Sequence, residues 1–268
     1  IDNPEADVPR IAILGRPNAG KSSFVNALLG KERTIVTDVA GTTRDSINTR
    51  YKLFGKDFIL TDTAGIRKKS KVHEDIEFYS VMRALQALQD SDVCVVMVDA
   101  TRGLESQDVN IISLALKYKK GIMLMINKWD LIEKETNTMN KFVAEIDEKL
   151  GQNTWIPKIF TSVTEKKRIF QAIELAVKVF ENRQRKVSTS QLNDAILPEI
   201  ERYPPPAIKG KYVKIKYITQ LPTHTPTIAF FCNLPQYIKA PYEAYLENKI
   251  REHFDFEGVP IKLVFRKK

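Results

Sequence analysis

The most constraining feature of the sequence is the stretch 15–22, Gly-Arg-Pro-Asn-Ala-Gly-Lys-Ser, with its spacing Gly-x-x-x-x-Gly-Lys-Ser. An apolar run, 11–14, precedes it, and an amphipathic segment, 23–29, follows it, which predicts strand, loop and helix in that order. Glycines let backbone N–H groups turn inward, and a helix N-terminus attracts anions. The stretch therefore predicts a phosphate-binding loop, with Lys21 on the β- and γ-phosphates of a nucleotide and the Ser22 hydroxyl on Mg²⁺. An ordinary glycine turn is the alternative for these eight residues alone.

Two further polar motifs follow apolar runs. The segment 62–65, Asp-Thr-Ala-Gly, comes after the run 58–60, and the segment 127–130, Asn-Lys-Trp-Asp, comes after the run 122–126. Open parallel sheets bind their ligands at the carboxyl ends of the strands. An aspartate linked to Mg²⁺ belongs at such an end, beside the phosphate loop. The three motifs together disfavour the ordinary turn and predict a nucleotide site.

The segment 127–130 also predicts which base is bound. The carboxylate of Asp130 can accept hydrogen bonds from N1 and the 2-amino group of guanine, whereas adenine offers an acceptor at N1 and no 2-amino group. A site built on such bonds rejects the wrong base by roughly 10⁴-fold or more. We expect Asn127 to tie this loop to the phosphate loop and the stem of Lys128 to lie on the purine. The segment 161–163, Thr-Ser-Val, is expected to offer a backbone N–H group to guanine O6, although Ser-Ala is the usual form of this motif.

These motifs resemble those of known GTPases. Residues 10–180 resemble a small GTPase domain of the translation-factor-related class, and the segment 38–45, Asp-Val-Ala-Gly-Thr-Thr-Arg-Asp, resembles the first switch of the Der (EngA) and tRNA-modification families. The whole chain is most similar to the second G domain and KH-like domain of the Der family of bacterial GTPases, in particular at 127–130, 245–252 and 256–261. The resemblance implies hydrolysis of GTP to GDP and phosphate, and a role in assembly of the large ribosomal subunit.

The resemblance also implies how hydrolysis is supported. Many GTPases place a glutamine after Asp-x-x-Gly to orient water, but here the residue is Ile66. Asn18 matches the asparagine that holds K⁺ in cation-activated relatives, where the ion acts much as an arginine finger does. The alternative is that Asn18 is simply a turn residue, because asparagine is favoured in turns. The backbone at Thr37, Val39 and Thr42 would complete the K⁺ shell, and Thr43 would meet Mg²⁺ opposite Ser22.

The sequence thus predicts a set of site residues. The expected catalytic residues are Lys21, Thr43, Gly65 and Asn18, and Asp62 is expected to reach Mg²⁺ through water. The expected nucleotide contacts come from the phosphate loop, the Asp-Thr-Ala-Gly segment and the base-binding loops: Gly15, Arg16, Pro17, Asn18, Ala19, Gly20, Lys21, Ser22, Ser23, Asp62, Thr63, Ala64, Gly65, Ile66, Asn127, Lys128, Trp129, Asp130, Ser162 and Val163. The basic segment 66–71 is expected to be the mobile second switch. Its Arg67, Lys68, Lys69 and Lys71 are candidates for RNA contact, and a solvated flexible loop is the alternative to that contact.

The basic charge of the chain is unevenly distributed. The 268 residues have a formal net charge of +9. Residues 1–180 hold 27 Lys and Arg against 24 Asp and Glu, whereas residues 181–268 hold 15 against 9. A basic surplus in one module points to a polyanion such as RNA, and a solvated basic surface is the alternative.

The C-terminal part has the element order of a KH module. Residues 190–200 predict a helix, 212–221 and 227–234 two strands, 241–254 a helix and 260–265 a last strand. The Gly-x-x-Gly loop with which KH modules clamp single-stranded RNA is missing. We therefore expect contact with folded RNA or a ribonucleoprotein through phosphates, by Lys209, Lys211, Lys214, Lys216, Arg266, Lys267 and Lys268. The missing loop disfavours the Era family, and the C-terminal module disfavours the tRNA-modification family.

Composition narrows the remaining possibilities. Hydrophobic residues make up 43% and charged residues 28%, as in soluble globular proteins, and no apolar run approaches the roughly 20 residues that cross a bilayer. Cys94 and Cys232 lie in apolar runs and are expected to be core thiols, which suits a reducing cytoplasm. The polar segment 1–9 begins with Ile1 and predicts a linker to an upstream G domain that this sequence does not contain.

The predicted architecture is α/β, a doubly wound P-loop GTPase domain followed by a smaller α+β KH-like domain. The predicted bounds are 1–9 for the linker, 10–182 for the GTPase domain and 190–268 for the KH-like domain. The expected cofactors are GTP or GDP, Mg²⁺ and K⁺, and the expected partners are the large ribosomal subunit and its rRNA, with no membrane. A nucleotide-gated RNA-binding module with negligible turnover is the alternative function. An ATP-dependent kinase or motor is disfavoured by Asn127 and Asp130.

Overall fold

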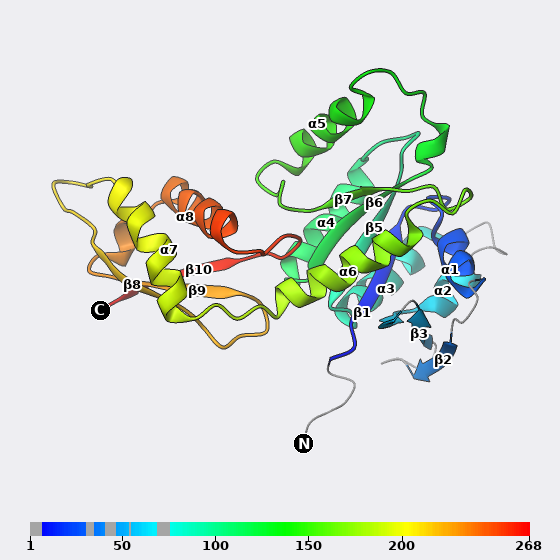
Figure 1. Cartoon of the computed structure of the whole chain (residues 1–268), viewed down its shortest axis with the longest axis horizontal. Helices are drawn as coiled ribbons and strands as arrows, with labels where there is room; N and C mark the ends of the chain where they lie inside the picture. Colours follow the sequence, from blue (N-terminus) through cyan, green and yellow to red (C-terminus); the bar gives the residue numbers. More distant parts are fainter. Residues whose placement is uncertain (1–6, 31–34, 41–46, 54, 69–75) are drawn as a thin grey trace. The chain divides into compact units, whose positions relative to one another are not determined.

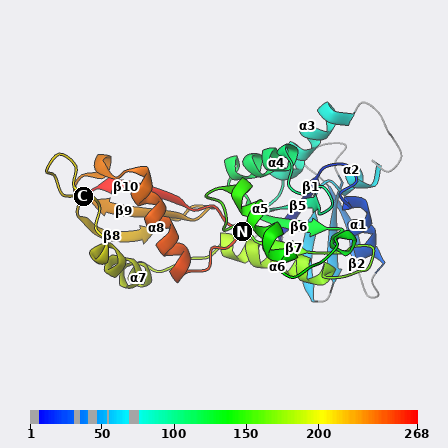
Figure 2. The ribbon, with the colours of Figure 1, turned by 90° about the horizontal axis from the view of Figure 1, so that it is seen from above.

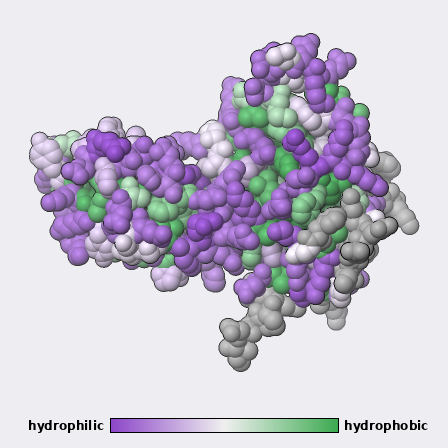
Figure 3. Space-filling view, viewed as in Figure 1, coloured by the Kyte–Doolittle hydropathy of each residue, from purple (hydrophilic) through white to green (hydrophobic). Residues whose placement is uncertain are grey.

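The computed structural model describes residues 7–30, 35–40, 47–53, 55–68 and 76–268. It divides into two compact units, Ile1–Phe180 and Glu181–Lys268. Figure 1 shows the sheet and helices of each unit. Hydrophilic side chains dominate the face shown in Figure 3. No helix among the described residues is long and apolar enough to cross a membrane.

The first unit is built on a mixed sheet of seven strands in the order β2-β3-β4-β1-β5-β6-β7. The strands β4, β1, β5, β6 and β7 run parallel, and β3 runs antiparallel to both of its neighbours. The strand bounds are β1 Arg10–Gly15, β2 Ile35–Ala40, β3 Ile47–Leu53, β4 Lys56–Leu60, β5 Val93–Asp99, β6 Gly121–Asn127 and β7 Lys158–Phe160. The antiparallel hairpin of β2 and β3 was not predicted from the sequence, because neither strand is a continuous apolar run.

Helices cover both faces of this sheet because its central strands are buried on both sides. Every residue of β5 and β6 is buried, as expected of parallel strands with continuous apolar sequence. Residues of α3, α4 and α5 share one core cluster with alternate residues of β1, β5 and β6. Val179 of α6 approaches Gly121 of β6, and Figure 2 shows α4 and α6 on opposite sides of the strands. The bounds are α1 Lys21–Leu29, α2 Thr63–Lys68, α3 Ile76–Gln89, α4 Ser106–Lys117, α5 Thr138–Leu150 and α6 Ile169–Arg183, with a short 3₁₀ helix, η1, at Trp129–Leu131.

The second unit is a three-stranded sheet with two helices. The strand order is β10-β9-β8, with β9 parallel to β10 and antiparallel to β8. The bounds are α7 Thr189–Arg202, β8 Ile215–Gln220, β9 Thr227–Cys232, η2 Pro235–Tyr237, α8 Ala240–His253 and β10 Lys262–Lys267. Ser188 and Gln191 form a capping box that begins α7. The element order confirms the α+β prediction for this part of the chain.

The predicted loop after Asp62 differs from the structure in one respect. Residues 63–68 form α2, so the first part of the expected second switch, 66–68, is helical, while 69–71 lie outside the described residues. The basic composition suggested a solvated loop, but Ile66 is buried and the helix contacts β3 and α1. The burial of Ile66 and the contacts of α2 with β3 and α1 therefore stabilise a helix here, although the segment is polar and basic in sequence.

Candidate nucleotide-binding site

The phosphate loop connects β1 to α1 and depends on two glycines. Gly15 has a φ of 156°, and a Cβ there would lie 2.5 Å from the Met97 carbonyl oxygen. Gly20 has a φ of 114° and precedes the first residue of α1, and a Cβ there would overlap Nδ2 of Asn127. Lys21 Nζ donates a hydrogen bond to the Gly15 carbonyl across the loop. The loop is thus closed on itself at the N-terminus of a helix, the arrangement that binds phosphate.

Asn127, at the end of β6, holds three segments together. Its Nδ2 donates to the carbonyl of Ala19 at 2.9 Å, which is the tie between loops that the sequence predicted. Its Oδ1 accepts from the Val163 backbone N–H at 3.1 Å and from Thr161 Oγ1 at 3.4 Å. The side chain is 2% exposed. A buried amide with these three hydrogen bonds fixes the relative position of the phosphate loop and the base-binding loops.

Hydrogen bonds within the protein also occupy the backbone N–H groups of 161–163. The Thr161 N–H donates to Ile126, the Ser162 N–H to Lys167 and the Val163 N–H to Asn127. All three backbone N–H groups of this segment therefore have protein partners in this structure. None of them is free to donate to guanine O6 as the sequence predicted. The sequence could not show this, because two of the acceptors, Ile126 and Asn127, lie in β6 and meet the segment only when the chain is folded.

Asp130 lies in η1, directly after β6, and carries an orphaned acceptor. Its Oδ1 atom is buried and has no hydrogen-bond partner among the described residues. A buried carboxylate oxygen without a donor is costly unless a ligand supplies one. The neighbouring Trp129 packs its ring against Phe142 and Phe160, with centroids 5.4 and 4.6 Å away. The indole of Trp129 thus anchors η1 in the core, which differs from the direct nucleotide contact expected of it.

Lys128 is held by an acidic partner that sequence analysis missed. Its φ of 61° is left-handed, and its Nζ lies 3.0 Å from Oδ2 of Asp99 at the end of β5. Thr101 donates to the other oxygen of Asp99 through both its backbone N–H and its hydroxyl. Burial raises the pKa of Asp99, but the bonds from Thr101 and Lys128 outweigh it and leave the pKa below its ordinary value. The position of Asp99 after an apolar strand was the signal that could have identified it.

Two of the residues expected around Mg²⁺, Ser22 and Asp62, are each tied to neighbouring segments, Ser22 to α2 and Asp62 to β3 and α3. The Ser22 hydroxyl donates to the Ile66 carbonyl at 3.0 Å, which leaves its lone pairs free to accept a cation. Asp62 has a φ of 51°, its backbone N–H donates to Asn48 Oδ1, and its carboxylate lies 3.8 Å from Nε of Arg83. A Cβ on Gly65 would lie 2.7 Å from Oδ2 of Asp62. The donor set, a hydroxyl and a carboxylate, suits Mg²⁺.

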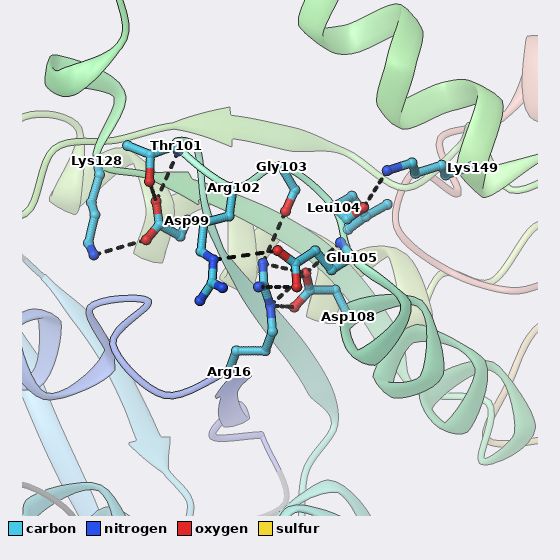
Figure 4. A network of polar contacts seen from close by, with 10 residues as sticks. All are labelled: Arg16, Asp99, Thr101, Arg102, Gly103, Leu104, Glu105, Asp108, Lys128 and Lys149. Atoms are coloured by element: carbon cyan, nitrogen blue, oxygen red, sulfur yellow. Dashed lines mark hydrogen bonds and ion pairs between the residues drawn. The ribbon is translucent and has the colours of Figure 1, made fainter.

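Arg16 of the phosphate loop is locked to the N-terminus of α4 (Figure 4). Its guanidinium contacts both Asp108 oxygens, with Nη2 3.1 Å from Oδ2, and its Nη1 lies 2.6 Å from Glu105. Nη2 also donates to the Gly103 carbonyl. Burial lowers the pKa of Arg16, but Asp108 and Glu105 outweigh it and raise that pKa. Arg16 was expected to contact the nucleotide, and the structure instead directs its side chain into the protein.

The remaining predicted residues fall into four groups. Thr63 and Ala64 are the first two residues of α2, and the Thr63 hydroxyl donates to the Ile47 carbonyl at 3.0 Å. Pro17, Asn18 and Ser23 are exposed around the loop, and Asn18 has a φ of 66°. Thr37 and Val39 lie on β2, which β3 and β4 separate from β1. Thr42 and Thr43 lie outside the described residues.

This fold and these motifs define a P-loop GTPase domain followed by a KH-like domain. Residues 10–128 match the family model described as a 50S ribosome-binding GTPase, and residues 186–266 match the model of the C-terminal KH-domain-like part of EngA bacterial GTPases. The chain is 66% identical to GTPase Der of Amoebophilus asiaticus over 98% of its length, and 60% identical to that of Cytophaga hutchinsonii over 100%. The chain belongs to the GTPase Der family, and it spans 61% of the length of these relatives.

A solved structure of Era, in complex with MgGDPNP and a segment of 16S ribosomal RNA, also resembles the chain. It is 20% identical, covers 97% of this chain and 93% of its own, and has a TM-score of 0.48.

Proposed function

We propose that this chain binds GTP at the phosphate loop, hydrolyses it, and uses the nucleotide state to control docking on the large ribosomal subunit during assembly. The observation that carries the proposal is the buried, unpartnered Oδ1 of Asp130, held near the phosphate loop through Asn127. Guanine presents two N–H groups that such a carboxylate accepts, and adenine presents none in that place. In the proposed complex these two N–H groups donate to the Asp130 carboxylate. The buried oxygen then has a partner, and the hydrogen bonds are charge-assisted.

Hydrolysis in this proposal depends on positioning and charge neutralisation. Water attacks the γ-phosphorus, the bond to the oxygen bridging the β-phosphate breaks, and GDP and phosphate leave with one proton released. Bound Mg²⁺ and K⁺ would supply positive charge beside the phosphates. Ser22, Asp62 and Thr43 would hold Mg²⁺, and Asn18 would hold K⁺ with the backbone of the first switch. Lys21 would contact the β- and γ-phosphates. The Gly65 N–H, which donates to the Asp62 carbonyl at 3.1 Å in this structure, would turn to the γ-phosphate.

The identity of Ile66 is the reason to consider an alternative function with negligible GTP turnover. Ile66 occupies the place where many GTPases have glutamine, and its side chain is 8% exposed. An apolar, buried side chain cannot orient water, so turnover depends on the cations or on a partner. The alternative is a nucleotide-gated RNA-binding module with negligible turnover. Single-turnover GTP hydrolysis by the isolated chain separates the two, because only the enzyme releases phosphate at a measurable, K⁺-stimulated rate.

Docking on the ribosomal particle is proposed through the basic second unit. All the cations expected to contact phosphates are exposed: Lys209, Lys211, Lys214, Lys216, Arg266, Lys267 and Lys268. Contacts between such residues and phosphates weaken steeply with salt. The test is co-sedimentation with large ribosomal subunits in the presence of GDP or a GTP analogue. The proposal requires different affinities in the two nucleotide states, because a ligand shifts an equilibrium only by its differential affinity. Equal affinities would contradict the regulatory part of the proposal.

A further inference from the structure

The sheet of the second unit has one face in the core and one face outside it. Residues Ile218, Ile228 and Phe230 share a core cluster with the helices α7 and α8. Successive side chains of a strand point to opposite faces. The alternate residues Tyr217, Phe231 and Val264 are outside that cluster and only partly buried. They therefore lie on the face opposite the helices.

The register of the strands sets two aromatic rings and an arginine in one row on this outer face. Tyr217 of β8 pairs with Phe231 of β9, and Phe231 pairs with Arg266 of β10. The two rings are stacked, with centroids 4.5 Å apart and an interplanar angle of 8°. The Lys268 ammonium lies 4.4 Å from the centroid of the Tyr217 ring. The row thus places a preformed aromatic stack between cationic side chains.

The strands that carry this row contain basic side chains and no acidic ones. No Asp or Glu occurs in β8, β9 or β10, whose sequences are Ile-Lys-Tyr-Ile-Thr-Gln, Thr-Ile-Ala-Phe-Phe-Cys and Lys-Leu-Val-Phe-Arg-Lys. Lys216, Lys262 and Arg266 are exposed, and among the described residues none of the three forms an ion pair with a carboxylate. Aromatic rings beside unpaired cations are the combination with which proteins bind single-stranded nucleic acid, because bases stack on the rings and phosphates meet the charges.

We propose that this outer sheet face binds single-stranded RNA, with an unpaired base stacking against the Tyr217–Phe231 pair and neighbouring phosphates meeting Arg266 and Lys268. The inference rests on the proposed RNA contact. It assigns that contact to the outer face of the sheet and names single-stranded RNA as the ligand. It differs from the expectation of contact with folded RNA through phosphates alone. Recognition by stacking requires no Gly-x-x-Gly loop, so the absence of that loop does not oppose it. It requires an unstacked base, which a continuous duplex does not offer.

The test measures anisotropy of a labelled 12-nucleotide oligouridine with the full chain, against a labelled RNA duplex of equal length. Tyr217→Ala is expected to weaken single-strand binding about tenfold, because the base loses an aromatic ring on which it stacks. Tyr217→Phe keeps the ring and should bind as the wild type does. Tyr212→Ala is the matched control, because Tyr212 is 77% exposed in the same unit but precedes β8. Arg266→Ala should flatten the salt dependence of binding.

The outcomes separate this inference from the proposed function. If Tyr217→Ala and the wild type bind oligouridine equally, the stacking site is wrong, whatever the result of ribosome co-sedimentation. Equal affinity of the wild type for duplex and single strand would overturn it in the same way. Loss of ribosome docking in Tyr217→Ala with unchanged oligouridine binding would show that this face contacts a protein and would also overturn it. Failure of the wild type to dock on ribosomes, with the stacking result intact, would contradict only the proposed function.

Discussion

Arg16 and Asp108 form a buried ion pair that joins the phosphate loop to the first turn of α4. Nη2 of Arg16 lies 3.1 Å from Oδ2 of Asp108, and the two side chains are 8% and 0% exposed. Asp108 also accepts from the Glu105 backbone N–H within the capping box of α4. This ion pair therefore fixes the proposed phosphate-binding loop to α4, a helix that begins 90 residues later in the chain.

Replacing Arg16 should destabilise the first unit. Arg16→Gln leaves the Asp108 carboxylate buried without its partner, and breaking a buried pair in this way costs about 3–5 kcal/mol. Urea unfolding measures the loss. Arg102→Gln is the control, because Arg102 pairs with Glu105 while 63% exposed, and it should cost less than about 1 kcal/mol. Similar small losses for both variants would show that the Arg16 pair does not stabilise the fold.

Gly20→Ala should impair nucleotide binding through Asn127. A Cβ at Gly20 would overlap the Asn127 Nδ2 atom, and Asn127 cannot withdraw without breaking the bonds to Ala19, Val163 and Thr161. We expect GDP affinity to fall by more than about tenfold, the equivalent of one lost hydrogen bond to a buried group. Gly55 also has a positive φ, 72°, but a Cβ there meets no atom within 4 Å, so Gly55→Ala serves as the control for substitution at a positive φ without a clash. A loss of GDP affinity as large in Gly55→Ala would point to strain instead.

Asp99 should make the first unit sensitive to acid. Its pKa is below the ordinary 3.8 in the folded protein, so the unfolded chain binds a proton more readily. The stabilisation is therefore fully present above pH 3.8 and is lost as the pH falls through the folded pKa. Asp99→Asn should show a shallower decrease in unfolding free energy over this window than the wild type. Parallel curves for the two proteins, measured by urea unfolding at a series of pH values, would contradict this account.

Potassium should stimulate hydrolysis if Asn18 holds it. Exchange of Na⁺ for K⁺ is expected to raise single-turnover GTP hydrolysis, because the ion neutralises charge that develops on the phosphates. Asn18→Ala should remove the increase and leave GDP affinity unchanged. Asn26→Ala, on the exposed side of α1, is the control and should keep the increase. Hydrolysis that is indifferent to K⁺ in the wild type would mean that a partner supplies the missing charge.

The parts of the fold that the sequence predicted are those with strong local signals. The apolar runs at 11–14, 93–98 and 122–126 form β1, β5 and β6, since continuous hydrophobic runs are typical of strands buried on both faces. The three motifs follow β1, β4 and β6 at their carboxyl ends, as expected of an open sheet.

What the sequence could not predict depends on contacts between distant residues. Arg16 meets Asp108 across 92 positions, and Lys128 meets Asp99 across 29. Neither pair has a local pattern, because the partners approach only when the strands align. The β2–β3 hairpin was missed because β2 overlaps the switch-like segment 38–45, which was interpreted by its resemblance alone.

The central claim is that Asp130 selects guanine, and a competition assay with three nucleotides tests it most directly. A fluorescent GDP analogue bound to the wild-type chain should be displaced by GDP and not by ADP or XDP. In Asp130→Asn the preference should move from GDP to XDP, because an amide can donate to the 2-oxo group that replaces the amine. The loss of the charge-assisted pair should weaken GDP binding by on the order of 3 kcal/mol, about 150-fold. Unchanged GDP affinity in Asp130→Asn, with no gain for XDP, would show that the base binds elsewhere and would contradict the account.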